Sequence, residues 1–225
     1  MSPPSPTIMK NLKPIKAILY LVVLLVIVIS SFRYITDFKK IKAQKNTITF
    51  LSDSIRYVND ANLYYSKLLK FSLKFSNFSL SKDEIKLYNI TQDTAKSDLV
   101  NFNSILSKNR YSLILRYTEI GCNECSSLTI KKLNELKQQH PDMPIYALVD
   151  FTNYDSYLQW RKVGQINFPV FYVKKGDIAF DKDCDDYSYL FMVDNRGITS
   201  NFFIPNSGMP EAVDYYFGNL YKQKS

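Results

Sequence analysis

The sequence predicts an α/β domain with a central mixed sheet flanked by helices, preceded by an N-terminal transmembrane helix and a helical stalk. Three observations predict this class. Residues 17–32 are apolar and uncharged, residues 34–75 carry regular apolar positions without Pro or Gly, and strand-like and helix-like segments alternate from Tyr111 onward. A chain of 225 residues with 46% hydrophobic and 22% charged residues is globular and long enough for one such domain.

Residues 1–16 form a basic tail, and residues 17–32 (AILYLVVLLVIVISSF) form the predicted anchor. At about 1.5 Å per residue, this run is close to the shortest helix that spans a bilayer. A cleaved secretory signal is the alternative, but no small-x-small cleavage site follows, so we expect an uncleaved anchor.

The formal charge of +8 is concentrated around the anchor. Residues 1–46 hold eight Lys or Arg against one Asp, whereas residues 105–225 carry equal numbers of basic and acidic side chains. The positive charge therefore predicts contact with anionic lipid headgroups of the bilayer, and no nucleic acid partner.

Residues 33–79 are predicted to form a helical stalk. Ile41, Ile48, Ile55, Asn62 and Leu69 recur every seven residues and would form a seam along one side of the helix. Two interpretations stay open. The stalk forms a coiled-coil homodimer with Asn62 fixing its register, or it is a single amphipathic helix that lies on the membrane or on the domain.

Residues 80–225 are predicted to form the domain. The capping box Ser81–Glu84 indicates a short helix, and strand-like residues 87–90 and the apolar residues 99–102 follow. The later elements, in order, are strand Tyr111–Tyr117, helix Asn123–Gln139, strand Pro144–Val149, a helix from Asn153 or Asp155 to Val163, strand Pro169–Val173, strand Leu190–Val193, the turn Asp194–Gly197, strand Ile198–Ile204 and a helix from Met209 to Leu220.

Cys122 and Cys125 form a C-x-x-C pair between the strand and the helix that starts near Asn123. Cysteines three apart lie on one face of a helical turn, and the positive end of the helix dipole favours a thiolate at the first of them. This context predicts a redox-active pair that needs no metal and no organic cofactor. The alternatives are half of a zinc site, for which only Cys184 and His140 remain as ligands, and a structural or inert pair.

The order of strand, C-x-x-C helix, strand, helix, strand–turn–strand and final helix resembles the thioredoxin fold. Residues 168–171 and 190–198 resemble the TlpA-like, peroxiredoxin-related branch, and the whole is similar to thioredoxin-like proteins of the Bacteroidetes. The resemblance covers residues 85–225. It implies thiol–disulfide exchange with envelope proteins, in which Cys122 attacks and Cys125 resolves.

The resemblance also implies an inner (cytoplasmic) membrane protein with its C-terminal domain in the periplasm. Basic residues after the span favour the opposite orientation by the positive-inside rule. Because disulfides persist outside the cytoplasm, we still predict an exported domain.

Departures from the family pattern predict an altered site. Gly121 and Glu124 replace the family's Trp and Pro, and a carboxylate at position 124 disfavours a nearby thiolate. Ser188 stands where the family has a cis-proline that clamps the partner. These departures favour the alternative function, a non-catalytic thioredoxin-fold interaction module tethered to the membrane.

Cys184 lies in the acidic loop Asp181–Asp186, four residues before Ser188. It is either a third thiol near the site or a spare cysteine in a solvated loop. The loop lacks the glycine and the distal Glu of a calcium-binding EF-hand, so no calcium site is predicted.

Overall fold

The computed structural model describes residues 12–80, 85–91, 98–120, 123–184 and 187–220, so the helix predicted at Ser81–Glu84 lies outside the described residues. The chain divides into two compact units, Met1–Asp60 and Ala61–Ser225. Helix α2 (Leu12–Phe75) runs through both.

In the first unit, the apolar side chains of α2 are exposed. The most apolar window of the helix has a mean hydropathy of 2.5 and no buried residue, and α2 is the one helix among the described residues long and apolar enough to cross a membrane. The seam residues Ile41, Ile48 and Ile55 are likewise more than half exposed. Both interpretations of the stalk stay predictions.

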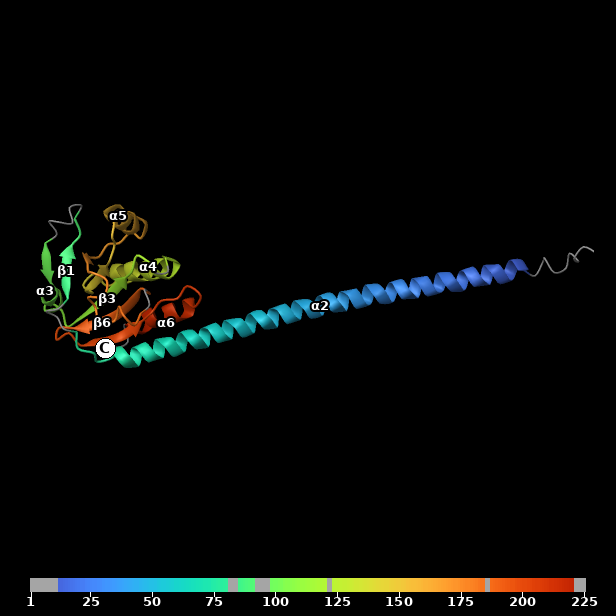
Figure 1. Cartoon of the computed structure of the whole chain (residues 1–225), viewed down its shortest axis with the longest axis horizontal. Helices are drawn as coiled ribbons and strands as arrows, with labels where there is room; N and C mark the ends of the chain where they lie inside the picture. Colours follow the sequence, from blue (N-terminus) through green and yellow to red (C-terminus); the bar gives the residue numbers. More distant parts are fainter. Residues whose placement is uncertain (1–11, 81–84, 92–97, 121–122, 185–186, 221–225) are drawn as a thin grey trace, which may run out of the picture. The chain divides into compact units, whose positions relative to one another are not determined.

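The second unit contains a seven-stranded sheet in the order β2-β1-β5-β4-β3-β6-β7 (Figure 1). Strands β3, β4 and β5 are parallel, whereas β6 and β7 on one side and β1 and β2 on the other are antiparallel to their neighbours. The strands are β1 (Lys86–Asn89), β2 (Leu99–Asn101), β3 (Tyr111–Tyr117), β4 (Ile145–Val149), β5 (Val170–Tyr172), β6 (Tyr189–Asp194) and β7 (Thr199–Phe203).

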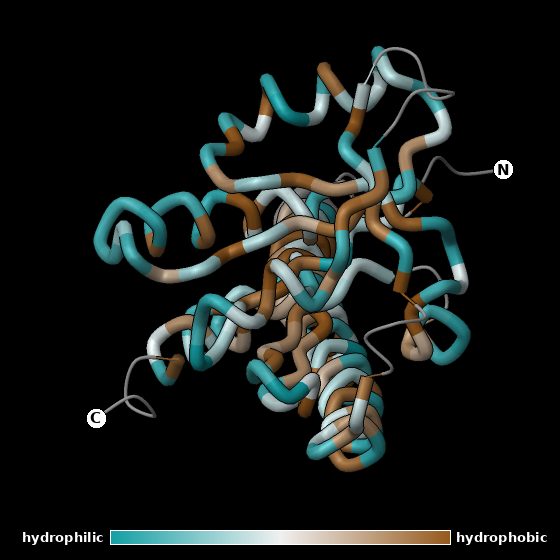
Figure 2. Tube along the Cα trace, turned by 90° about the vertical axis from the view of Figure 1, so that its left-hand side faces the viewer, coloured by the Kyte–Doolittle hydropathy of each residue, from teal (hydrophilic) through white to brown (hydrophobic). Residues whose placement is uncertain are grey.

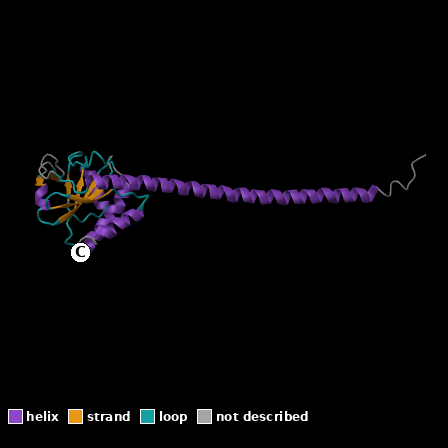
Figure 3. Cartoon of the chain, turned by 90° about the horizontal axis from the view of Figure 1, so that it is seen from below, coloured by secondary structure: helices purple, strands orange, loops and turns teal. Residues whose placement is uncertain are grey.

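Helices pack on both faces of this sheet (Figure 3). They are α3 (Phe102–Leu106), α4 (Asn123–Gln139), α5 (Tyr154–Val163) and α6 (Pro210–Leu220). The predicted α/β class, with a central mixed sheet flanked by helices, is confirmed. The order β3-α4-β4-α5, then β6-β7-α6, is the order expected of a thioredoxin-like fold.

Strand β3 separates two apolar cores because successive side chains point to opposite faces. Leu113 and Leu115 pack in the core under α4 and α6, whereas Ile114 packs in the core that includes α3. Figure 2 shows apolar residues gathered in the central strands and hydrophilic residues in the outer turns.

The C-terminal turns of α2 belong to the second unit and pack on the sheet. Ala61, Tyr64, Leu68, Phe71 and Phe75 recur at spacings of three and four, and Phe71 and Phe75 are buried. The Tyr64 hydroxyl donates to the Ile204 carbonyl at 2.8 Å. The second compact unit therefore includes these turns, because this face of the helix forms part of its core.

The turn between β6 and β7 depends on Asp194. Its Oδ1 accepts the backbone N–H groups of Arg196 and Ile198 at 2.9 and 2.8 Å, and Oδ2 accepts from the Arg196 guanidinium. Gly197 follows with φ of +90°, which a residue with a Cβ rarely adopts. Burial alone would raise the pKa of Asp194, but the hydrogen bonds from Ile198 and Arg196 outweigh it and lower this pKa.

We expect Asp194→Asn to destabilise the fold by roughly 1–2 kcal/mol at pH 7, because the charged acceptor is lost. The native Asp194 has a depressed pKa, so its stabilisation is fully present above about pH 4 and is lost as pH falls through the folded pKa. Denaturant unfolding of the native chain and of Asp194→Asn at pH 7 and pH 3 measures the difference between their free energies of unfolding. This difference should be smaller at pH 3. Asp142→Asn, on an exposed loop, is the control. An equal difference at both pH values would contradict the claim that the charge of Asp194 stabilises the turn.

Candidate functional site

Cys125 lies in the first turn of α4 and is 8% exposed. Its sulfur is held in a disulfide, whereas Cys184 is a thiol outside any disulfide. The backbone N–H of Ser207, in the loop before α6, donates to Cys125 Sγ at 3.3 Å, and Ser207 Oγ lies 3.6 Å from the same sulfur. A loop 82 residues further along the chain therefore contacts the cysteine directly.

Ser188 joins the end of β3 to the start of α4. It precedes β6 and is buried, and its Oγ accepts the backbone N–H of Thr118 at 3.3 Å. Its Oγ also lies 3.3 Å from the hydroxyl of Ser126, the residue after Cys125. The residue expected at the family's cis-proline position thus lies beside the helix start, and the described residues contain no cis peptide bond.

A buried ion-pair network lies on the face of β3 that carries Ile114. The side chain of Arg116 is fully buried and bonds to both oxygens of Asp181 at 3.0 Å. It also bonds to Asp150 Oδ2 at 3.0 Å. Tyr189 donates its hydroxyl to Asp181 Oδ1 at 2.8 Å, and the Gly176 N–H donates to Oδ2 at 2.9 Å. Each carboxylate oxygen of Asp181 therefore accepts two hydrogen bonds.

The network shifts the pKa values of its members. Burial lowers the pKa of Arg116, but the hydrogen bond and charge of Asp181 and the charge of Asp150 outweigh it, so the net pKa is raised. Burial, followed by the charge of Asp181, raises the pKa of Tyr189 well above its ordinary value. Arg116 therefore stays charged and Tyr189 stays a neutral donor.

Asp150 connects this network to the loop that precedes the C-x-x-C pair. Asp150 Oδ1 accepts the backbone N–H of Glu119 at 2.8 Å. In return, Glu119 Oε2 accepts the N–H and the hydroxyl of Thr152 at 3.0 and 2.9 Å. The loops after β3 and β4 are thus joined by reciprocal hydrogen bonds. Burial, then the charges of Glu119 and Asp150, raise the pKa of the adjacent Tyr117.

The other predicted site residues are Gly121, Cys122, Glu124 and Cys184. Gly121 and Cys122 lie outside the described residues. Glu124 is exposed in the first turn of α4. Cys184 is 1% exposed and packs in the core that includes Ile114, across the sheet from α4. The solvated loop proposed as an alternative for Cys184 is therefore wrong, and its role as a supporting thiol stays a prediction.

The acidic loop is occupied by ion pairs rather than arranged around a metal. Asp181 binds Arg116, and Asp183 pairs with Lys74 at 2.6 Å. Across the described ranges, no group of three or more His, Cys, Asp or Glu side chains could hold a metal ion.

Four contributors to the site were missed in the sequence: Arg116, Glu119, Asp150 and Ser207. Arg116 is a charged residue inside the apolar strand Tyr111–Tyr117, and its place there is a signal in the sequence, because a buried charge needs a buried counterion. Asp150 directly follows β4, which is a weaker signal. Nothing local marks Ser207, because its role depends on the loop's return to α4.

No protein-family model and no curated protein matches this chain. Among solved structures, the chain is similar to a protein of Chlorobium tepidum described as the thiol:disulfide interchange protein DsbE, with 12% identity, a TM-score of 0.46, and coverage of 63% of this chain and 96% of that one. A thiol:disulfide interchange protein of a Bacteroides species has 16% identity and a TM-score of 0.41, covering 65% and 96%. Peroxiredoxin Q of Xanthomonas campestris has 11% identity and a TM-score of 0.43, covering 64% and 94%.

Proposed function

We propose that this chain is a membrane-anchored thioredoxin-like protein of the TlpA-like branch, which exchanges disulfides with protein partners through Cys122 and Cys125. The observation that carries the proposal is the disulfide-bonded Cys125 in the first turn of α4. Its sulfur accepts a hydrogen bond from the backbone N–H of Ser207. A disulfide at a helix N-terminus suits exchange because the helix dipole favours the thiolate that opening the bond releases.

In the reducing direction, the Cys122 thiolate attacks one sulfur of a partner's disulfide and releases the other as a thiolate. The Cys125 thiolate then attacks Cys122 Sγ in the mixed disulfide and releases the partner's second thiolate. The partner gains two electrons, and the pair loses two as it closes its own disulfide. The oxidising direction is the reverse sequence.

The residues around Cys125 have distinct roles in this scheme. The Ser207 N–H stabilises charge on Cys125 Sγ when the pair is reduced. Ser188 holds the end of β3 against the start of α4 through Thr118 and Ser126. Asp150 fixes the backbone of Glu119, three residues before Cys122, so it positions the loop rather than reacting.

The proposal is tested by the rate at which the full chain, in detergent micelles with a thiol reductant, reduces a disulfide-bonded protein. We expect turnover by the native chain and none above the uncatalysed rate with Cys122→Ser, because the attacking sulfur is gone. Cys184→Ala tests the predicted supporting role of that thiol: its place across the sheet from α4 favours retained turnover, and a loss of turnover would assign it the supporting role. A folded native chain without turnover would leave the membrane-tethered interaction module as the function.

We also propose that residues 17–32 of α2 anchor the chain in the inner membrane with the second unit in the periplasm. The support is the unburied, uncharged apolar run of this helix. We expect a C-terminal fusion to a reporter enzyme that requires its own disulfides to be active in a bacterial host, because such bonds persist only outside the cytoplasm. An inactive, fully reduced reporter would place the domain in the cytoplasm.

A further inference from the structure

The stalk part of α2 carries an exposed apolar stripe along one side, named here the α2 stripe. Its members follow one another at alternating spacings of three and four residues, and its apolar members are between 47 and 67% exposed. They are Ile48, Leu51, Ile55, Val58, Tyr65 and Leu69, with Asn62 in the same row. An average spacing of 3.5 residues is the pattern that lets two helices wrap around each other.

In the second unit, the α2 stripe lies on a different side of the helix from the face that packs on the sheet. Tyr64 and Phe71 pack in the cores of the domain. Tyr65 and Leu69, in the same turns, are 47 and 61% exposed. The sheet of the same chain therefore leaves the stripe open as far as Leu69.

The charged residues of this stretch lie away from the α2 stripe. Between Thr47 and Leu69 the sequence has four of them, and all four fall on the opposite side of the helix at 3.6 residues per turn. They are Asp53, Arg56, Asp60 and Lys67. Arg56 pairs with Asp53 at 3.5 Å, and Lys67 Nζ lies 4.4 Å from the centroid of the Tyr187 ring. A helix packed on the stripe would bury none of these charges.

The residues at the two edges of the α2 stripe are uncharged. One edge carries Ser52, Asn59 and Ser66, and the other carries Thr47, Ser54, Ala61 and Leu68. The hydroxyls of Thr47 and Ser54 donate to the carbonyls of Ala43 and Phe50, one turn earlier, at 3.1 and 2.8 Å. Two identical helices can therefore meet along the stripe without bringing like charges together, and these two hydroxyls are already paired.

This charge pattern favours a second helix over a membrane surface as the partner of the α2 stripe. A helix that lies on a bilayer typically carries Lys and Arg on its polar face, which bind anionic headgroups. Here the polar side carries two acidic and two basic residues. In contrast, Ile48 and Ile55 at one core position with Leu51 at the other are typical of a parallel two-stranded coiled coil.

The exposed apolar area is large enough for a stable pair of helices. Each apolar side chain of the α2 stripe exposes about half or more of its surface. With about 100 Å² for each of them, two copies would bury about 1,200 Å², the lower end of the range for specific interfaces.

We propose that a second copy of this chain packs on the α2 stripe and forms a parallel two-stranded coiled coil from Ile48 to Leu69. Asn62 pairs with its counterpart in the second copy, and this polar pair fixes the register of the two helices. The parallel direction follows from the proposed anchor, because both copies then start in the same membrane.

The protein mass in micelles tests the pairing. The full chain is kept with a large excess of micelles, and light scattering measures its mass separately from the detergent. We expect two chains per complex for the native chain and association at least about 100-fold weaker for Ile55→Lys, because pairing would bury two ammonium groups. Phe50→Lys is the matched control on an exposed position outside the stripe, and it should keep the two-chain mass.

Two results would overturn the pairing. One is a native chain with the mass of a single copy, and the other is Ile55→Lys that pairs as tightly as the native chain. Ile55 is 61% exposed and lies outside both cores, so its replacement should leave the domain folded. A native thermal melt of the variant checks this.

Cross-linking tests the direction and the register. In a chain with Cys122→Ser and Cys125→Ser, a cysteine replaces either Leu51 in the α2 stripe or Asp53 on the opposite side. Residue 51 meets its own counterpart only if the helices are parallel and in register, so mild oxidation should join Leu51→Cys into a covalent dimer. Asp53→Cys should give at least about ten-fold less dimer. Equal yields, or no dimer from Leu51→Cys, would overturn the proposal.

Asn62→Ile tests the polar residue of the α2 stripe. The variant should associate more tightly than the native chain but lose the single two-chain mass, because a polar core residue limits the oligomeric state at a cost in stability. The same light-scattering measurement reads both effects. A variant with the mass and the affinity of the native chain would contradict the place of Asn62 in the interface.

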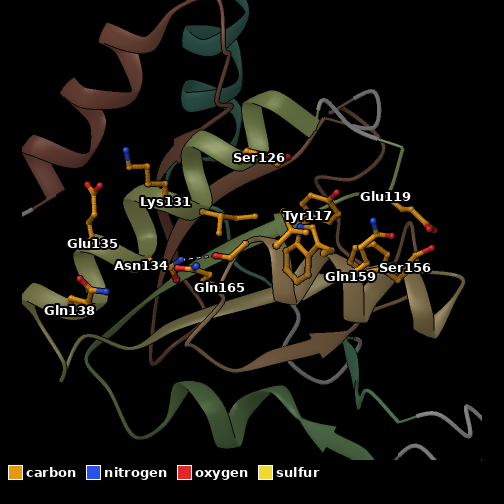
Figure 4. Close-up of a pocket in the computed structure, with 16 residues that line it drawn as sticks. Tyr117, Glu119, Ser126, Lys131, Asn134, Glu135, Gln138, Ser156, Gln159 and Gln165 are labelled. Carbon is orange, nitrogen blue, oxygen red and sulfur yellow. Dashed lines mark hydrogen bonds between the residues drawn. The ribbon is translucent and has the colours of Figure 1, made fainter.

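The pairing is independent of the proposed exchange of disulfides. The pocket between α4 and α5 contains Ser126, the residue after Cys125, and none of its lining residues belongs to α2 (Figure 4). Ile55→Lys should therefore lose the pairing and keep the turnover of the native chain. Turnover by a native chain of single-copy mass would contradict this proposal alone, and pairing without turnover would contradict the proposed function alone.

Discussion

Replacing Arg116 by methionine is expected to destabilise the fold by about 3–5 kcal/mol, the usual cost of removing one partner of a buried ion pair. The substitution leaves the carboxylates of Asp150 and Asp181 buried without their counterion, since their side chains are 9% and 4% exposed. Denaturant unfolding of the full chain in micelles measures the loss. The same substitution should loosen the Glu119 loop, because Asp150 would no longer be fixed.

Lys182→Met is the matched control for charge, because Lys182 is an exposed residue in the same loop as Asp181. It should change stability by no more than about 0.5 kcal/mol. Adding Asp150→Asn and Asp181→Asn to Arg116→Met should recover part of the loss, since the uncompensated charges are removed. If Arg116→Met were as stable as Lys182→Met, the network would have no structural role.

Cys125→Ser is expected to accumulate mixed disulfides between Cys122 and partner proteins. The attacking sulfur remains but the resolving sulfur is gone, so the adduct decays only by uncatalysed rearrangement, over about minutes to hours. Non-reducing electrophoresis of membranes that contain the variant should resolve adducts of higher mass that disappear on addition of a reductant.

Two further variants define the source of these adducts. Adding Cys122→Ser to Cys125→Ser should abolish them, whereas adding Cys184→Ala should leave them, since Cys184 is buried in the opposite core. Adducts that survive without Cys122 would assign the reactivity to another thiol, and a total absence of adducts would favour the interaction module.

Local patterns predicted most of the elements. The helix that contains Cys125 and the strand before the cysteine pair lie at their predicted bounds, Asn123–Gln139 and Tyr111–Tyr117. Strong periodicity made this possible, together with distinct end signals such as Pro141 after α4 and Gly164 after α5. Helix α3 was not predicted, because it is five residues long and its cap, Asn101, closes the strand β2.

Long-range contacts could not be predicted. The heptad at Asn62 and Leu69 marks one side of α2, but Tyr64, Phe71 and Phe75 on another side pack on the sheet. Both sides carry apolar residues, so periodicity alone does not identify the buried one. Similarly, the bond of Ser207 to Cys125 spans 82 residues and depends on the complete sheet.

The reduction potential of the Cys122–Cys125 pair tests the central claim most directly. The full chain in micelles is equilibrated in thiol/disulfide buffers, and free thiols are trapped and counted. The proposed function predicts a reversible couple between about −300 and −120 mV, the range of known exchange proteins. A pair that never cycles, or one that stays oxidised well below about −300 mV, would contradict the proposed exchange.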